Sequence, residues 1–301
     1  MNYFIQSSET DISPNDFVVM RIQIDIFRNT IKVLLIVLLT SSFVYCKEST
    51  IPYDPGLVVI LKADDLGEMT PNWERFMHII FKDSICGSIG IIADRMKSDS
   101  TVDEIRKISG YKRDNKFPVI EFWNHGYNHI KNKNGTEFDG STIEYQANHL
   151  QMTQEFMNDK LRIQCHTFGA PYNRTDINTL KALYFSPEIC VWFCLKNLEK
   201  EEKKGWKNPD DHPALDNNKI LLDVDYYFYK IFPVDKMMNN YSKDRLKPYI
   251  VIQVHPLMWK DKNFDDFETL IKFYKSRKTT FMTPFQYYQY LNDIFEGDTR
   301  I

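Results

Sequence analysis

The sequence predicts an α/β fold, a single distorted (β/α)7-8 barrel of parallel strands over residues 51–301. Eight short apolar runs of strand length are spaced along this region, and a helical pattern or a long crossover follows each of them. That alternation is typical of a parallel sheet. In addition, polar motifs fall at the ends of the runs, and the carboxyl ends of the strands build the functional site in parallel barrels.

The expected strands are runs in which β-branched and aliphatic residues dominate. In chain order they cover residues 57–63, 87–93, 117–123, 163–168, 190–195, 219–225, 249–255 and 279–282. The charged segment 196–218 contains glycine and proline, and we expect it to be an exposed loop between two strands.

Capping residues and apolar periodicity indicate where the helices begin. Pro71 occupies a favoured early position of a helix whose apolar side chains share one face. Thr101 with Glu104, and Ser141 with Glu144, match the capping box that begins a helix. Further helices are expected from Asp176, Asp235, Phe264 and Pro284.

Length and charge exclude some classes of protein. With 301 residues, of which 43% are hydrophobic, the chain can bury a large core. Its formal net charge is -3 and it has no long stretch of Lys and Arg, which argues against a nucleic-acid-binding protein. The five cysteines form no C-x-x-C pair, so a zinc ribbon is not expected.

Residues 1–50 have the pattern of an N-terminal extension with a targeting signal. Residues 33–45 are apolar or small, with basic residues before them and CKEST after them, as in a signal peptide or signal anchor. Met20 opens a more ordinary basic region, so we expect translation to start there. Cys46 resembles the lipid-accepting cysteine of bacterial lipoproteins, but Tyr45 stands where those signals have a small residue, so ordinary cleavage nearby is the alternative. Both alternatives place the folded part outside the cytoplasm, either secreted or attached to a membrane.

Residues suited to metal binding and proton transfer come at the expected strand ends. His125 and His129 lie four positions apart after the third strand, a spacing that lets two imidazoles face one divalent metal ion. Taken alone, this H-x-x-x-H match is weak evidence. The other residues expected at the same rim are Asp64, Asp65, Pro171, Tyr172, Asp225 and His255.

These residue types support metal-assisted hydrolysis. One carboxylate, from Asp64 or Asp65, would complete a two-histidine, one-carboxylate metal site that leaves coordination positions open. The second carboxylate could act as general base, and His255 could protonate a leaving group. Each residue also has a structural alternative, because the aspartates could cap the following helix and His255 could be hydrogen-bonded at a strand end.

Four motifs resemble those of the polysaccharide deacetylase superfamily, metal-dependent esterases that remove N- or O-linked acetyl groups from glycans on a distorted (β/α) barrel. The motifs are ADDLG at 63–67, HGYNH at 125–129, GAPYN at 169–173 and VHP at 254–256. The resemblance covers about residues 57–293, and ADDLG is also similar to the first motif of chitooligosaccharide deacetylases. It implies a hydrolase that needs one divalent metal ion, expected to be zinc, and acts on an acetylated amino sugar or polysaccharide.

The same resemblance implies a role for each motif residue. Asp64 is the implied general base and His255 the implied general acid. The backbone N–H of Tyr172 is implied to help hold a tetrahedral oxyanion. The implied metal ligands are Asp65, His125 and His129.

Two glycines depart from the family pattern. Gly169 stands where the third motif usually begins with arginine, the residue that steers the catalytic aspartate, and the candidates to replace it are Arg174 and Lys62. Gly126 stands where the second motif commonly has Ser or Thr, which removes a supporting hydroxyl. The fourth motif is matched only loosely, by Asp223 and Asp225. We therefore expect a divergent member.

An alternative is a catalytically silent glycan-binding or scaffold protein on the same fold. The missing arginine at Gly169 favours this alternative. So do aromatic side chains that could be exposed for sugar stacking, namely Trp206, Tyr226, Tyr227 and Trp259.

Overall fold

The computed structural model describes residues 56–113, 116–133, 135–194, 205–206, 219–229 and 232–298. The expected targeting segment, with Met20 and Cys46, lies outside the described residues, as does most of the expected loop at 196–218. Among the described residues, no helix is both long enough and apolar enough to cross a membrane.

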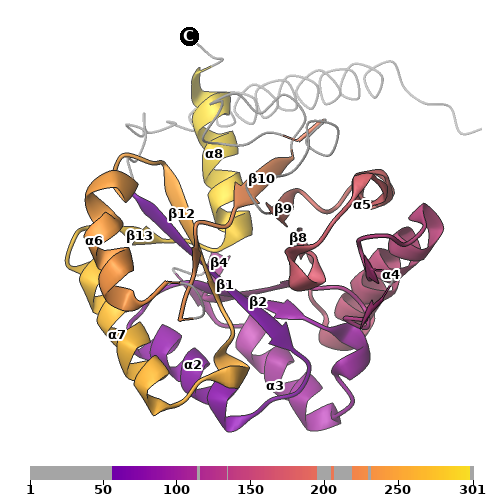
Figure 1. Ribbon diagram of the computed structural model, residues 1–301, viewed down its shortest axis with the longest axis horizontal. Coiled ribbons are helices and arrows are strands. Elements are labelled where there is room, and N and C mark those ends of the chain that lie inside the picture. Colours follow the sequence, from indigo (N-terminus) through magenta and orange to yellow (C-terminus); the bar gives the residue numbers. More distant parts are fainter. Residues whose placement is uncertain are drawn as a thin grey trace, which may run out of the picture. The chain divides into compact units, whose positions relative to one another are not determined.

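Within the described part of the chain, seven parallel strands form a closed barrel (Figure 1), which confirms the predicted fold class. In spatial order they are β10 (Ile220–Asp223), β9 (Val191–Cys194), β8 (Thr167–Gly169), β5 (Ile120–Asn124), β2 (Gly87–Ile91), β1 (Val58–Leu66) and β12 (Tyr249–Val254). The barrel closes because the chain crosses to β12 directly after β10. There the Asp225 N–H donates to the Val251 carbonyl at 3.0 Å, and β11 (Tyr226–Tyr227) pairs in parallel with β12.

Helices surround the strands (Figure 1). They are α2 (Pro71–Lys82), α3 (Asp99–Ser109), α4 (Ile143–Phe156), α5 (Ile177–Leu183), α6 (Val234–Asp244), α7 (Asp261–Lys275) and α8 (Pro284–Asp298). Helix α2 shows why the sequence folds in this way. Its Trp73, Phe76 and Ile80 recur at helical spacing and are fully buried, and burial of each such side chain is worth about 1.5–3 kcal/mol.

Short elements complete the fold at the edges of the barrel. The strand β13 (Thr280–Phe281) pairs with the first residues of β1. Two antiparallel hairpins also form, β3 (Lys112–Arg113) with β4 (Phe117–Pro118) and β6 (Lys131–Asn132) with β7 (Gly135–Thr136). The second hairpin directly follows the histidine motif and so forms part of the surroundings of the site.

Trp123 of β5 packs against two glycines on neighbouring strands. A Cβ atom at Gly90 of β2 would lie 2.5 Å from the indole ring, and one at Gly169 of β8 would lie 2.8 Å from it. Both distances are shorter than a real contact allows, so only glycine leaves room for this ring. The indole is fully buried.

The strand expected at 163–168 is wrong in its position. The observed strand β8 begins only at Thr167, because a π-helical turn at Met157–Leu161 prolongs the helical path of α4. The Ile163 N–H still donates to the Met157 carbonyl at 2.9 Å. Residues 162–166 therefore connect the helix to the strand rather than belong to the sheet.

Two predicted helix caps are also wrong by one to three residues. The side chains that accept the capping hydrogen bonds of α3 and α4 belong to Ser98 and Thr142. The hydroxyl of Thr101 instead donates to Glu68 at 2.8 Å, and that of Ser141 donates to the Glu137 carbonyl at 2.7 Å. Both hydroxyl groups that the sequence pattern assigned to capping thus bind residues that precede the helix.

Candidate metal centre

A backbone irregularity at the end of β1 lets the adjacent carboxylates of Asp64 and Asp65 both approach His125. In a regular strand, Asp64 and Asp65 would point in opposite directions. Asp65 instead has a left-handed backbone with φ of 76°, and the pairing of β1 with β2 shifts register between Ala63 and Leu66. As a result, Asp64 and Asp65 both lie within 4 Å of His125 Nε2, at 3.9 Å and 3.2 Å.

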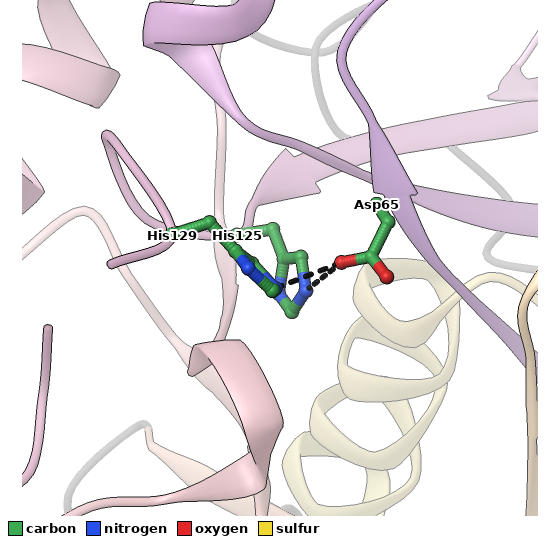
Figure 2. A group of neighbouring side chains, drawn as sticks. All are labelled: Asp65, His125 and His129. Atoms are coloured by element: carbon green, nitrogen blue, oxygen red, sulfur yellow. Dashed lines mark hydrogen bonds and ion pairs between the residues drawn. The ribbon is translucent and has the colours of Figure 1, made fainter. Parts of the chain in front are cut away.

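The carboxylate of Asp65 faces two imidazoles (Figure 2). Its Oδ1 atom lies 3.2 Å from His125 Nε2 and 2.9 Å from His129 Nε2. Burial by itself would raise the pKa of Asp65, but the hydrogen bonds with the two histidines outweigh burial and hold this pKa well below its usual range. The structure therefore brings together the three residues that were predicted as metal ligands.

Backbone geometry orients both imidazoles. His125 Nδ1 lies 2.6 Å from the Gly169 carbonyl oxygen, which can only accept, so Nδ1 carries a hydrogen and the ring is turned with Nε2 toward Asp65. His129 has a left-handed backbone with φ of 57°, and its ring centroid lies 4.4 Å from that of Tyr172. The Tyr172 hydroxyl donates to the His129 carbonyl at 3.3 Å.

A buried carboxylate that was not predicted from the sequence holds the loop between the two histidines. Glu137 Oε1 accepts the Tyr127 N–H at 2.5 Å, and Oε2 accepts the His129 N–H at 2.7 Å. His149 Nδ1 lies 2.9 Å from Oε1 on the other side. Glu137 lies in a polar stretch without periodicity, so only its contacts distinguish it from a surface residue.

The donor set fits a divalent metal ion. Ligand atoms of Asp65, His125 and His129 all lie within 4.8 Å of one another. Two imidazole nitrogens and one carboxylate oxygen suit zinc and other first-row transition ions, and three protein ligands leave coordination positions open, as catalytic sites do. These three residues would hold the ion.

Asp64 has a different set of partners from its neighbour. Lys62 Nζ lies 2.7 Å from Oδ1 and 2.5 Å from Oδ2, and Gln253 Nε2 donates to Oδ2 at 2.6 Å. The amide of Asn173 donates to Gln253 Oε1 at 2.8 Å, which leaves the Gln253 nitrogen to face Asp64. Burial lowers the pKa of Lys62, while the charge of Asp64 and its hydrogen bond oppose that shift.

His255 follows β12 and faces both aspartates. Its Nε2 atom lies 3.9 Å from Asp64 Oδ2, 3.7 Å from Asp65 Oδ2 and 3.2 Å from the Tyr227 hydroxyl. Burial lowers the pKa of His255, against the opposing charges of Asp64 and Asp65. The imidazole can therefore exchange a proton with a group bound beside the carboxylates.

Comparison with known proteins gives a match in structure but not in sequence. No family model and no curated protein matches this sequence. A proposed polysaccharide deacetylase from Mycobacterium smegmatis superposes with a TM-score of 0.58 at 13% identity, over 80% of this chain and 92% of the other. The peptidoglycan deacetylase PdaC from Bacillus subtilis gives 0.50 at 12% identity, over 82% and 97%.

Two further matches name the CE4 family directly. The Xyl-CE4 domain of a multidomain xylanase from a Trinervitermes trinervoides hindgut metagenome gives a TM-score of 0.50 at 13% identity, over 81% of this chain and 91% of that one. A CE4 family pseudoenzyme from Bacillus anthracis gives 0.50 at 12% identity, over 77% and 65%. This chain has the CE4 deacetylase fold.

Lys62, one of the two residues predicted to replace the arginine of the third motif, lies beside Asp64. A Cβ atom at Gly169 would lie 2.8 Å from the Trp123 ring and 3.3 Å from Phe193 Cβ, so a larger residue has no room there. Of the two predicted replacements, Lys62 contacts both Asp64 oxygens. Arg174 instead pairs with Asp139 and is half exposed.

Gly126, the second glycine that departs from the motifs this sequence resembles, also has a structural reason. Its φ is 81°, and a Cβ atom on it would lie 2.7 Å from Glu137 Oε2. The carboxylate of Glu137 therefore occupies the room of a serine or threonine side chain, and it supports the histidine loop through the backbone.

Some residues expected at the rim or on the surface lie elsewhere. The Asp225 carboxylate binds Lys247 at 2.8 Å and the Val251 N–H at 2.9 Å, because the chain turns toward β12 at this point. The aromatic residues expected to be exposed are wrong as a set. Trp206, Tyr226 and Trp259 are only 5%, 5% and 6% exposed, and Tyr227 is half-buried against His255.

Proposed function

We propose that this protein is a metal-dependent hydrolase that removes acetyl or other acyl groups from an amino sugar or polysaccharide. The proposal rests on one observation: the two adjacent carboxylates, Asp64 and Asp65, contact different partners. Asp65 faces two imidazoles within 3.2 Å, whereas Asp64 faces Lys62 and Gln253. This difference supports a role for Asp65 as a metal ligand and for Asp64 as the base.

The proposed reaction is hydrolysis of an amide or ester bond. A metal ion, expected to be zinc, would polarise the acyl carbonyl and make water more acidic. Asp64 would accept the proton of the attacking water, and the backbone N–H of Tyr172 would help to hold the oxyanion. His255 would donate a proton to the leaving amine or alcohol. The products are the free carboxylic acid, such as acetate, and the deacylated sugar.

The proposed setting is outside the cytoplasm. It rests on the apolar run at 33–45 with basic residues before it, and on Cys46 as an acceptor for a lipid. Either secretion or attachment to a membrane would place the barrel where polysaccharides are accessible. Fractionation of cells, with Cys46→Ser as the comparison, tests the lipid anchor against ordinary cleavage.

Acetate release tests the proposed reaction. Purified protein with about one bound zinc ion per chain should release acetate from acetylated glucosamine oligomers or acetylated xylan. Asp64→Asn should lower the rate by about 100-fold or more while the zinc remains bound. Zinc-loaded wild-type protein that releases acetate no faster than Asp64→Asn across such substrates would contradict the proposal.

The alternative is a catalytically silent protein that binds glycans on the same fold. It is favoured by the match to a CE4 family pseudoenzyme and by the absence of arginine at position 169. Trp206 and Trp259 are buried and so do not contribute an exposed aromatic surface for such binding. Binding of oligosaccharide without acetate release, unchanged by Asp64→Asn, would support this alternative.

A further inference from the structure

Distance alone does not explain why only one of the two adjacent aspartates would bind the metal. Asp64 Oδ2 lies 3.9 Å from His125 Nε2, and Asp65 Oδ1 lies 3.2 Å from the same atom. A small side-chain rotation of Asp64 would suffice to offer a second carboxylate to an ion held there. Some other contact must therefore keep Asp64 out of the ligand set.

The contacts of Asp64 supply that restraint. Both of its oxygens lie within 2.7 Å of Lys62 Nζ, and Oδ2 also accepts from Gln253. Asn173 in turn fixes the orientation of the Gln253 amide. A charge-assisted contact to both oxygens is stronger than a neutral hydrogen bond. Of these partners, only Lys62 can offset the charge of Asp64.

Lys62 is itself enclosed by the protein core. It lies two residues before Asp64 on β1, so both side chains are on the same face of the strand. The lysine is fully buried, and its Nζ lies 5.1 Å from the Trp123 ring centroid and 5.7 Å from that of Phe193. Two aromatic rings therefore enclose the ammonium group at its position beside Asp64.

We propose that Lys62 is a positioning residue that keeps Asp64 from becoming a metal ligand and so preserves it as the base. The inference rests on the proposed metal site. A positioning role for Lys62 predicts an effect on metal binding that a role in stability alone does not predict. Loss of Lys62 should tighten metal binding, because it removes a nearby positive charge and releases a second carboxylate, while it should impair catalysis.

Metal binding to Lys62→Met tests this inference without relying on activity. The variant should bind Zn²⁺ about tenfold or more tightly than the wild type in equilibrium competition with a chelator. The visible spectrum of the Co²⁺-loaded variant should change, since an added oxygen ligand alters the coordination of the ion. Lys62→Met with Asp64→Asn should return both measurements to near wild-type values, because the second carboxylate is then absent.

Several comparisons make the result decisive. Lys219→Met removes a half-buried lysine that precedes β10 and donates to the Ile189 carbonyl at 2.6 Å, and it should leave Zn²⁺ affinity unchanged. If Lys62→Met does not fold, Lys62→Gln serves, because the shorter neutral side chain reaches at most one Asp64 oxygen. Where the wild type has acetate-releasing activity, Lys62→Met should lower kcat about 100-fold or more with little change in KM.

The outcomes separate this inference from the proposed function. If the wild type binds no Zn²⁺, the metal site and the inference both fail. If the wild type binds Zn²⁺ and a folded Lys62 variant binds it with equal or lower affinity, only the inference fails. Tighter binding that persists when Asp64→Asn is added would also overturn it, since Asp64 would then not be the released ligand.

Discussion

The carbonyl oxygen of Gly169 accepts a hydrogen bond from Nδ1 of His125 at 2.6 Å. Gly169, which stands where the similar motif has arginine, therefore orients a candidate metal ligand through its backbone. Trp123 occupies the space above this glycine, and Asp64 is contacted instead by Lys62 on another strand.

Restoring the family residue should harm this protein. Gly169→Arg would place atoms within 2.8 Å of the Trp123 ring, and even Gly169→Ala should lower the free energy of unfolding by about 1–3 kcal/mol. Urea unfolding measures the change. The matched control is Gly87→Ala. Its Cβ atom would lie 3.3 Å from the flexible tip of the Ile80 side chain, so this variant should lose less unfolding free energy than Gly169→Ala. Equal stability of Gly169→Arg and the wild type would contradict this packing.

The loop between the histidines should depend on Glu137. Glu137→Gln keeps the size of the side chain but removes the charge that accepts the Tyr127 and His129 N–H groups, and we expect Zn²⁺ affinity to fall about 10–100-fold. Gly126→Ser should act in the same direction by displacing this carboxylate. Chelator competition measures the affinity, and Zn²⁺ binding that is unaffected by Glu137→Gln would refute the supporting role.

Tyr227 should matter for turnover but not for metal binding. Its hydroxyl lies 3.2 Å from His255 Nε2, so Tyr227→Phe should reduce kcat about tenfold through a less well-oriented imidazole. Zn²⁺ content should stay at the wild-type level. Tyr229→Phe, on an exposed ring two residues further along, provides the comparison and should retain full turnover. If both variants behave alike, the contact with His255 has no catalytic role.

Glu121 should make stability depend on pH. Burial raises its pKa from 4.5 to about 6, against hydrogen bonds from Thr167 and the Phe285 N–H. A raised folded-state pKa favours the folded protein below pH 4.5, and this contribution is lost as pH rises to about 6. The loss is about 2 kcal/mol, so the unfolding free energy should fall over this window in the wild type but not in Glu121→Gln.

Chemical denaturation at a series of pH values measures this difference. The exposed Glu144→Gln serves as control and should keep the wild-type pH profile. Identical profiles for Glu121→Gln and the wild type between pH 4.5 and 6 would show that Glu121 does not titrate differently in the folded state.

The sequence predicts the barrel because its signals are local. Apolar runs such as 57–63 and 249–255 are long and β-branched, and their ends carry the motif residues Asp64, Asp65 and His255. The sequence predicts a strand at 163–168, but β8 begins only at Thr167. A π-helical turn precedes it, and such a turn has no local sequence signal.

The supporting residues of the site are not predictable in the same way. Gln253 meets Asp64 across 189 residues of sequence, and Asn173 meets Gln253 across 80. The first of these pairs depends on the register of β1 against β12, in which Lys62 is opposite Gln253. Lys62 could be suggested as a replacement for the arginine, but only the structure separates it from Arg174.

The metal content of two neighbouring variants tests the central claim most directly. Wild-type protein and Asp64→Asn should each retain about one Zn²⁺ per chain after dialysis, whereas Asp65→Ala should retain none, because Asp65 alone of the two carboxylates contacts both histidines. Loss of the ion from Asp64→Asn with retention in Asp65→Ala, or absence of the ion from the wild type, would contradict the assignment.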